Sequence, residues 1–120
     1  MHPTRVTSNI PITDLDRSRD FYQGFLGLEF EAFSLGWVTN LQSPDGRAQL
    51  QLVTRDATAP IDSVASVHVG HEVEEAYADA RRRGFEIVHP LTVEEWGVHR
   101  FFVRDPDGNV LNIVSHVDED

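Results

Sequence analysis

The chain has 120 residues, which is the length of one ordinary domain, and we expect a single domain over residues 1–120. Its 20 Asp and Glu residues against 10 Lys and Arg residues give a net charge of −10, which disfavours binding to nucleic acid. The absence of cysteine excludes disulfides and thiolate metal sites. No run of about 18 uncharged apolar residues occurs, so we expect a soluble cytoplasmic protein with no membrane partner.

The first half of the chain shows the pattern of a strand, a helix and three further strands. Apolar and polar residues alternate over residues 5–10, which predicts a half-buried strand. Helical spacing of apolar residues predicts a helix over residues 14–26 that ends at Gly27. The apolar face of this helix would consist of Leu15, Tyr22, Phe25 and Leu26. Aromatic and β-branched residues then predict strands over residues 29–33, 36–42 and 48–53.

The same order recurs in the second half, after a connector without periodicity at residues 55–63. The predicted elements are a strand over residues 66–69, a helix that begins at Val73 and stops at Gly84, and strands over residues 86–91, 98–104 and 110–116. Residues 117–120 would form a frayed acidic tail. We therefore predict two modules, at about residues 4–54 and 64–117, related by an internal duplication.

Short motifs in both halves carry a family resemblance. The first half contains Asp-Leu-Asp-Arg-Ser at residues 14–18, the pair Phe21 and Tyr22, and Leu-Gly-Leu at residues 26–28. The second half contains Phe-Val-Arg-Asp-Pro-Asp-Gly-Asn at residues 102–109. In these motifs the chain resembles the vicinal oxygen chelate superfamily, which includes glyoxalase I, extradiol dioxygenases, fosfomycin-resistance enzymes and bleomycin-resistance proteins.

The resemblance implies an α+β fold in which two βαβββ modules form curved mixed sheets around a cup. It also implies a homodimer, because members of the superfamily commonly pair. The superfamily spans lyases, isomerases, oxygenases, transferases and drug-binding proteins, so the fold alone does not fix the function.

Alternation along each strand predicts which side chains face the helices and which face the cup. We expect the helix-facing set to be Val6, Ile10, Leu50, Leu52, Val67, Val69, Leu111 and Ile113. The residues left for the cup floor are Thr7, Asn9, Gln49, Gln51, Ser66, His68 and Asn112.

The resemblance implies metal ligands at four cup positions, which fall on Thr7, Gln51, Ser66 and Asn112. Hydroxyls and neutral amides bind divalent transition metals poorly, and only Gln51 would be a credible ligand. We therefore expect no cofactor, with a divalent metal ion as the alternative. His68 would be a hydrogen-bond partner for a ligand, a lone metal ligand, a general base, or a strand histidine satisfied by a neighbour. It is the one candidate for a catalytic residue.

Three further residues complete the predicted site. Trp37 and Trp96 would offer an aromatic wall for a planar ligand, and core packing is the alternative for each. Arg100 lies on a predicted strand whose pattern does not tell which face the residue occupies. If Arg100 faces the cup, it would anchor an anion or carbonyl. If it does not, it would form a surface pair with an acidic residue.

These observations favour a metal-independent small-molecule binding protein that resembles the drug-sequestering bleomycin-resistance members. An aromatic ligand would be held in the cup by amide hydrogen bonds and aromatic stacking, and the net charge suits a cationic molecule. The alternative is an enzyme of the glyoxalase, isomerase or dioxygenase type, with a displaced metal site or with acid–base chemistry at His68. A third hypothesis is an interaction module whose cup is filled.

Overall fold

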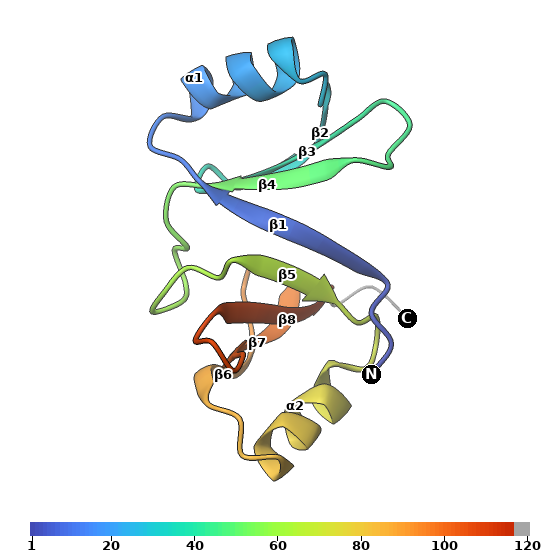
Figure 1. Cartoon of the computed structure of the whole chain (residues 1–120), viewed down its shortest axis with the longest axis vertical. Helices are drawn as coiled ribbons and strands as arrows, with labels where there is room; N and C mark the ends of the chain where they lie inside the picture. Colours follow the sequence, from blue (N-terminus) through green and yellow to red (C-terminus); the bar gives the residue numbers. More distant parts are fainter. Residues whose placement is uncertain (117–120) are drawn as a thin grey trace. The chain divides into compact units, whose positions relative to one another are not determined.

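The structure is a computed structural model that describes residues 1–116 (Figure 1). Its elements, in chain order, are β1 (Arg5–Pro11), α1 (Leu15–Arg19), the π-helical segment η1 (Asp20–Phe25), β2 (Phe30–Ser34), β3 (Val38–Gln42), β4 (Gln49–Val53), β5 (Ala65–His68), α2 (Val73–Arg82), β6 (Ile87–Val93), β7 (Val98–Arg104) and β8 (Val110–His116). This order confirms the predicted α+β fold of two βαβββ modules. The predicted acidic tail at residues 117–120 lies outside the described residues.

The chain divides into two compact units, which we describe separately. The N-terminal unit comprises residues 7–57, and the C-terminal unit comprises residues 1–6 together with the chain from Thr58 onward. The grouping of both into a single domain, with the connector at residues 55–63, stays a prediction. Within residues 1–116, no helix is long and apolar enough to cross a membrane.

The sheet of the N-terminal unit has the strand order β2-β3-β4-β1, with β1 parallel to β4 and the other pairs antiparallel. Its core lies on the side that faces α1, where Leu28, Leu41 and Leu52 are buried. Ile10 and Leu50 pack against them, as the strand alternation predicted, and so do Leu15 and Tyr22 of the predicted helix face. The prediction for Val6 was wrong, because the cluster reaches Ile10 and Ile12 but leaves the Val6 side chain 60% exposed.

The predicted first helix is correct in position but wrong in its second half. After Arg19 the helix widens into η1, in which the Leu26 amide donates to the Phe21 carbonyl over 3.0 Å, five residues back. The predicted apolar face assumed about 3.6 residues per turn. The wider turn rotates Phe25 and Leu26 outward, where they are 74% and 49% exposed.

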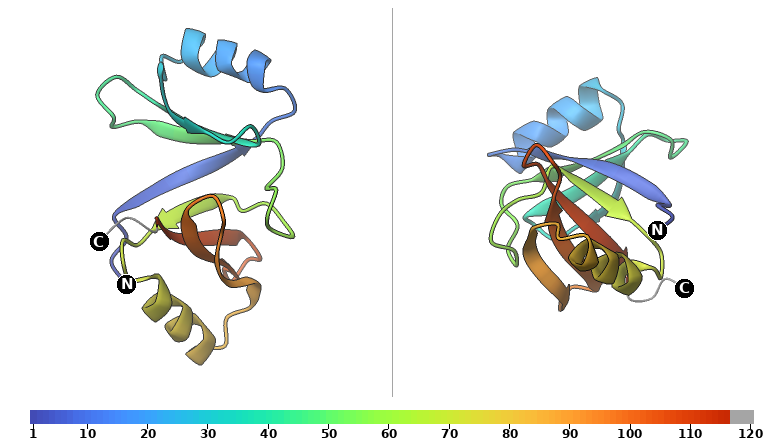
Figure 2. Two further views of the ribbon diagram at one scale, coloured as in Figure 1. Left: turned by 180° about the vertical axis from the view of Figure 1, so that it is seen from behind. Right: turned by 60° about the horizontal axis from the view of Figure 1, so that its bottom comes forward.

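The sheet of the C-terminal unit has the strand order β5-β8-β7-β6, with β5 parallel to β8 and the other pairs antiparallel. Helix α2 covers one face of this sheet (Figure 2). On that face Ala76 and Ala80 pack against Phe101 and Ile113. Val67, Val69, Leu111 and Ile113 all belong to this core, so their predicted orientation is confirmed. The opposite face of the sheet carries polar side chains beside a smaller apolar cluster of Ala59, Phe102 and Val110.

The two modules repeat in backbone detail. Gly27 and Gly84 follow the helices of their modules with φ of 79° and 77°. This left-handed conformation is one that glycine adopts without steric cost, so it explains why both helical segments stop at a glycine.

Candidate functional site

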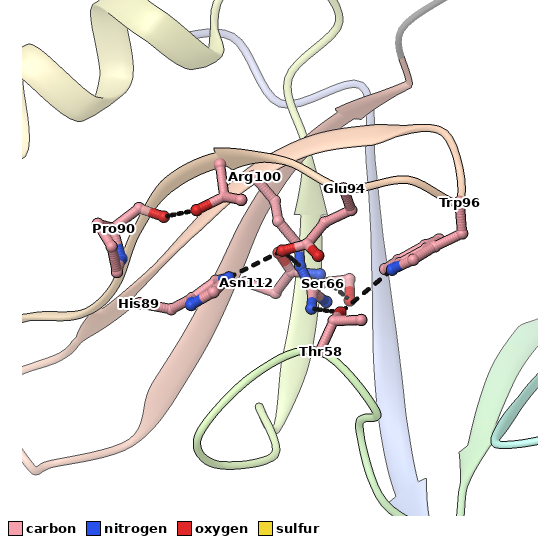
Figure 3. A network of polar contacts seen from close by, with 9 residues as sticks. Thr58, Ser66, His89, Pro90, Glu94, Trp96, Arg100 and Asn112 are labelled. Carbon is pink, nitrogen blue, oxygen red and sulfur yellow. Dashed lines mark hydrogen bonds and ion pairs between the residues drawn. The ribbon is translucent and has the colours of Figure 1, made fainter.

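The face of the C-terminal sheet that lies opposite α2 carries the predicted polar residues of this unit. Ser66, His68 and Asn112 are 3%, 4% and 7% exposed. They alternate with the core residues Val67 and Ile113, so they point away from the helix. Ser66 and Asn112 are direct neighbours across β5 and β8, and the Asn112 side-chain amide donates to Ser66 Oγ over 3.1 Å (Figure 3).

Asn112 has an acceptor that the protein does not use. Its Oδ1 atom is shielded from solvent and has no hydrogen-bond partner among the described residues. An unmade hydrogen bond at a buried carbonyl oxygen costs about 1–3 kcal/mol. A bound molecule that donates an N–H or O–H group there would recover this energy.

His68 lies beside a cation rather than a carboxylate. Arg5 Nη2 is 3.2 Å from His68 Nδ1 and 3.3 Å from Nε2, and the His116 ring stacks on the His68 ring at a centroid distance of 5.4 Å. Burial first, and then the charges of Arg5 and His116, lower the pKa of His68 from 6.5 to about 4. His68 is therefore a neutral imidazole at physiological pH.

This lowered pKa predicts a pH-dependent stability. As the pH falls below about 6.5, the unfolded chain takes up a proton at His68 before the folded chain does, so stability is lost between about pH 6.5 and pH 4. Between about pH 7.5 and pH 5.5 we expect urea denaturation to show a loss of about 1 kcal/mol that His68→Asn removes. The exposed residue His71 gives the control, because His71→Asn should retain the loss. An unchanged pH dependence in His68→Asn would contradict this account.

Arg100 occupies the same face as Phe102, opposite the α2 core, and only 1% of the residue is exposed. Its Nε atom donates to Glu94 Oε1 over 3.4 Å, and its Nη2 atom donates to Thr58 Oγ1 over 2.8 Å. Its partner Glu94 is itself only 7% exposed. The acidic partner of Arg100 is thus buried rather than at the surface, and the guanidinium is fixed by the fold.

Trp96 lies in the turn between β6 and β7 and contributes to the same cluster (Figure 3). Its indole N–H donates to Thr58 Oγ1 over 3.1 Å, and the Arg100 guanidinium carbon lies 5.0 Å from the Trp96 ring centroid. The guanidinium also lies 4.9 Å from the Phe102 ring centroid. One face of the predicted stacking residue is therefore occupied by a cation of the protein itself.

Sequence reasoning missed several members of this cluster. His89 Nε2 lies 2.9 Å from Glu94 Oε1, and Glu94 also accepts from Arg100. Glu94 and Arg100 are only six residues apart. A hairpin predicted between β6 and β7 could therefore have indicated that the two side chains lie close together. The register of this hairpin shifts between His89 and Thr92, and periodicity does not reveal such a shift.

The predicted residues of the N-terminal unit form a separate set. Thr7 and Gln51 are 1% and 8% exposed, and Asn9 pairs with Gln51 in the register of β1 and β4. Gln49 accepts from the Asn40 amide over 3.4 Å, although Asn40 was not a predicted site residue. Trp37 is partly buried, and its carbonyl accepts from the Thr54 amide over 3.0 Å.

The donor chemistry of the described residues does not fit a metal centre of the superfamily type. The four positions implied for ligands carry two hydroxyls and two amides, on Thr7, Gln51, Ser66 and Asn112. Among residues 1–116, no group of three or more His, Asp or Glu side chains gathers where it could hold an ion. Neutral oxygens offset the desolvation of a divalent ion poorly.

Comparison with known proteins places this fold in a family. Residues 3–113 match the model of the Glyoxalase/Bleomycin resistance protein/Dioxygenase superfamily. No curated protein matches the chain. Among solved structures, the chain is similar to an NAD-dependent benzaldehyde dehydrogenase from Legionella pneumophila, with a TM-score of 0.74 and 20% identity over 93% of this chain and 99% of that chain.

It is also similar to two methylmalonyl-CoA epimerases. The one from Mycobacterium tuberculosis has a TM-score of 0.69 and 19% identity over 95% of this chain and 89% of that chain. The one from Streptomyces coelicolor has a TM-score of 0.67 and 19% identity over 99% of both chains. At such identities these likenesses show the fold alone. The family match covers most of the sequence, and the chain therefore belongs to the Glyoxalase/Bleomycin resistance protein/Dioxygenase superfamily.

Proposed function

We propose that this protein binds a small molecule without a metal ion, on the sheet face of the C-terminal unit that carries Ser66 and Asn112. The observation that supports this proposal most directly is the buried and unpartnered Asn112 Oδ1 atom. A ligand with an N–H or O–H group would donate to it, and aromatic ligands would gain stacking energy on Trp96. As for the bleomycin-resistance members, binding would be the activity itself. The homodimer and the cytoplasmic location stay predictions.

The enzyme alternative has weaker support. Acid–base chemistry works best when the pKa of the catalytic group lies near the working pH. Burial first, and then Arg5 and His116, hold the pKa of His68 at about 4, which makes it a poor proton acceptor at neutral pH. The enzymes among the structural neighbours share the fold with this chain, and that likeness names no reacting group here.

The proposal predicts that affinity and stability respond differently to one substitution. In Asn112→Leu, which has a similar shape, we expect the loss of the hydrogen bond to Ser66 to be offset by removal of the unsatisfied oxygen. The free energy of unfolding should stay within about 1 kcal/mol of the wild type, whereas ligand affinity should fall at least about tenfold. A thermal-shift screen of small aromatic and amine-bearing molecules, run with EDTA, supplies the ligand, and calorimetry measures both variants.

Asn40→Leu is the matched control. Asn40 is also a buried amide, but its side chain donates to Gln49 and accepts from Gln42. Its loss should lower stability and leave affinity unchanged. An Asn112→Leu variant that binds every ligand from the screen as tightly as the wild type would overturn the proposal.

A further inference from the structure

Arg5 is a charged residue that the proposed function does not use. It is partly buried at the start of β1, and the backbone bond from the Thr4 amide to the His68 carbonyl, 2.8 Å long, holds it beside β5. Its Nη2 atom contacts the His68 ring. Among residues 1–116, no carboxylate contacts the Arg5 guanidinium.

This environment differs from that of the other partly buried arginines. Arg19 pairs with Glu31 over 2.8 Å, and Arg104 pairs with Glu86 over 2.8 Å. The chain has twice as many acidic residues as Lys and Arg residues, so acidic partners are plentiful in the sequence. The guanidinium of Arg5 instead lies next to an imidazole, which brings no negative charge.

The Nε atom of Arg5 has a second unusual feature. It is shielded from solvent and makes no hydrogen bond to any described residue. A guanidinium presents its N–H groups as a planar fork that matches two oxygens of a carboxylate or phosphate. One N–H group of such a fork, that of Nε, is unused here. The unmade hydrogen bond costs about 1–3 kcal/mol.

The neighbouring side chains add nitrogen but no negative charge. The rings of His68 and His116 are stacked at an interplanar angle of 11°. His68 is held neutral beside Arg5, so one cation and two imidazoles gather at this end of β5 and β8. The guanidinium donates through all of its nitrogens and a neutral imidazole through one of its two, so this group can donate to an oxyanion.

We propose that Arg5, His68 and His116 form a subsite for the carboxylate or phosphate group of the small-molecule ligand. This inference rests on the proposed function and narrows the class of ligand. His68 is two residues beyond Ser66 on β5, and two residues along a strand span about 7 Å. The ligand is therefore a small acid with a hydrogen-bond donor at about this distance from its anionic group.

The net charge of −10 does not exclude such a ligand. Charges at the surface are screened over about 8–10 Å at physiological salt, so an anion inside the subsite responds chiefly to Arg5 and the two imidazoles. Affinity for an anion should then weaken as salt is added, because the anions of the salt compete for the Arg5 guanidinium.

The test uses inorganic phosphate and acetate as probes of the full-length protein, measured by calorimetry and by NMR shifts of the histidine rings. The wild type should bind at least one probe saturably, with shifts at His68 and His116. Arg5→Met should weaken binding at least tenfold, and Arg5→Lys should retain part of it, because the charge remains without the fork. Arg47→Met, at an exposed arginine, should bind as the wild type does.

Two results would overturn the subsite. The first is saturable binding that Arg5→Met and Arg5→Lys both leave intact. The second is that neither probe binds the wild type, whether or not binding appears once Asp118, Glu119 and Asp120 are replaced by their amides. If Arg5→Met fails to fold, the binding of the probes to Arg5→Lys decides whether the subsite exists.

The failure of this inference is distinguishable from the failure of the proposed function. If Asn112→Leu abolishes ligand binding and the Arg5 variants do not change it, the function stands and the subsite is wrong. If the probes bind through Arg5 but no small molecule depends on Asn112, the subsite stands and the proposed function is wrong.

Discussion

Replacing Glu94 with glutamine is expected to lower the free energy of unfolding by about 3–5 kcal/mol, because it removes a buried carboxylate that pairs with the buried Arg100 guanidinium. Arg100 and Glu94 are 1% and 7% exposed, so water cannot take over the role of the carboxylate. The same substitution removes the negative charge next to His89. Urea denaturation of the wild type and Glu94→Gln gives the difference directly.

A double-mutant cycle with Arg100→Met separates the ion pair from general damage. Methionine keeps much of the arginine stem and its contact with Phe102, while it removes the charge. The double variant Glu94→Gln/Arg100→Met should lose less stability than the sum of the two single variants, since it removes both charges of the pair. Additive losses, or a loss below about 1 kcal/mol in Glu94→Gln, would show that the two charges are not coupled.

The second large effect concerns the core under α2. Phe101→Ala is expected to cost about 3–5 kcal/mol, because it removes a large side chain and leaves a cavity. Phe101 is 1% exposed, packs with Ala76, Ala80 and Ile113, and meets the Tyr77 ring edge-on at a centroid distance of 5.0 Å. Thermal unfolding should show a lowered Tm.

Phe25→Ala is the matched control for that substitution. Phe25 is 74% exposed on η1, so its truncation should change stability by no more than about 0.5 kcal/mol. A comparable loss in both phenylalanine variants would mean that Phe25 is covered in solution. A small loss in Phe101→Ala would contradict the assignment of the α2 core.

The strands followed from the sequence because their signal is local. The sequence predicted strands over residues 98–104 and 110–116, which are the bounds of β7 and β8. Alternation over two residues also predicted which face of β5 and β8 carries Ser66, His68 and Asn112. The π-helical turn at Asp20–Phe25 could not be predicted this way. Its hydrogen bonds join residues that are five apart, whereas the predicted α-helix has bonds between residues that are four apart.

The site was only partly predictable from the sequence, because Arg5 and Arg100 meet their partners through contacts between residues that are far apart in the chain. Arg5 reaches His68 across 63 residues of sequence, and Arg100 reaches Thr58 across 42. Neither pair leaves a pattern of spacing. Glu94 lies in a turn, where no alternation marks a face, so its burial beside Arg100 emerges only once β6 and β7 pair.

Binding of a small molecule through Asn112 without a metal ion can be tested directly. The measurement is the thermal stability of metal-free wild-type protein with small acids that carry a hydrogen-bond donor, beside the same titration with Ni, Zn, Mn and Fe ions. We expect saturable stabilisation by an acid in the presence of EDTA, about 2.7 kcal/mol at one hundred times Kd, and its loss in Asn112→Leu. Stabilisation only when a metal ion is present, or equal stabilisation of Asn112→Leu, would contradict it.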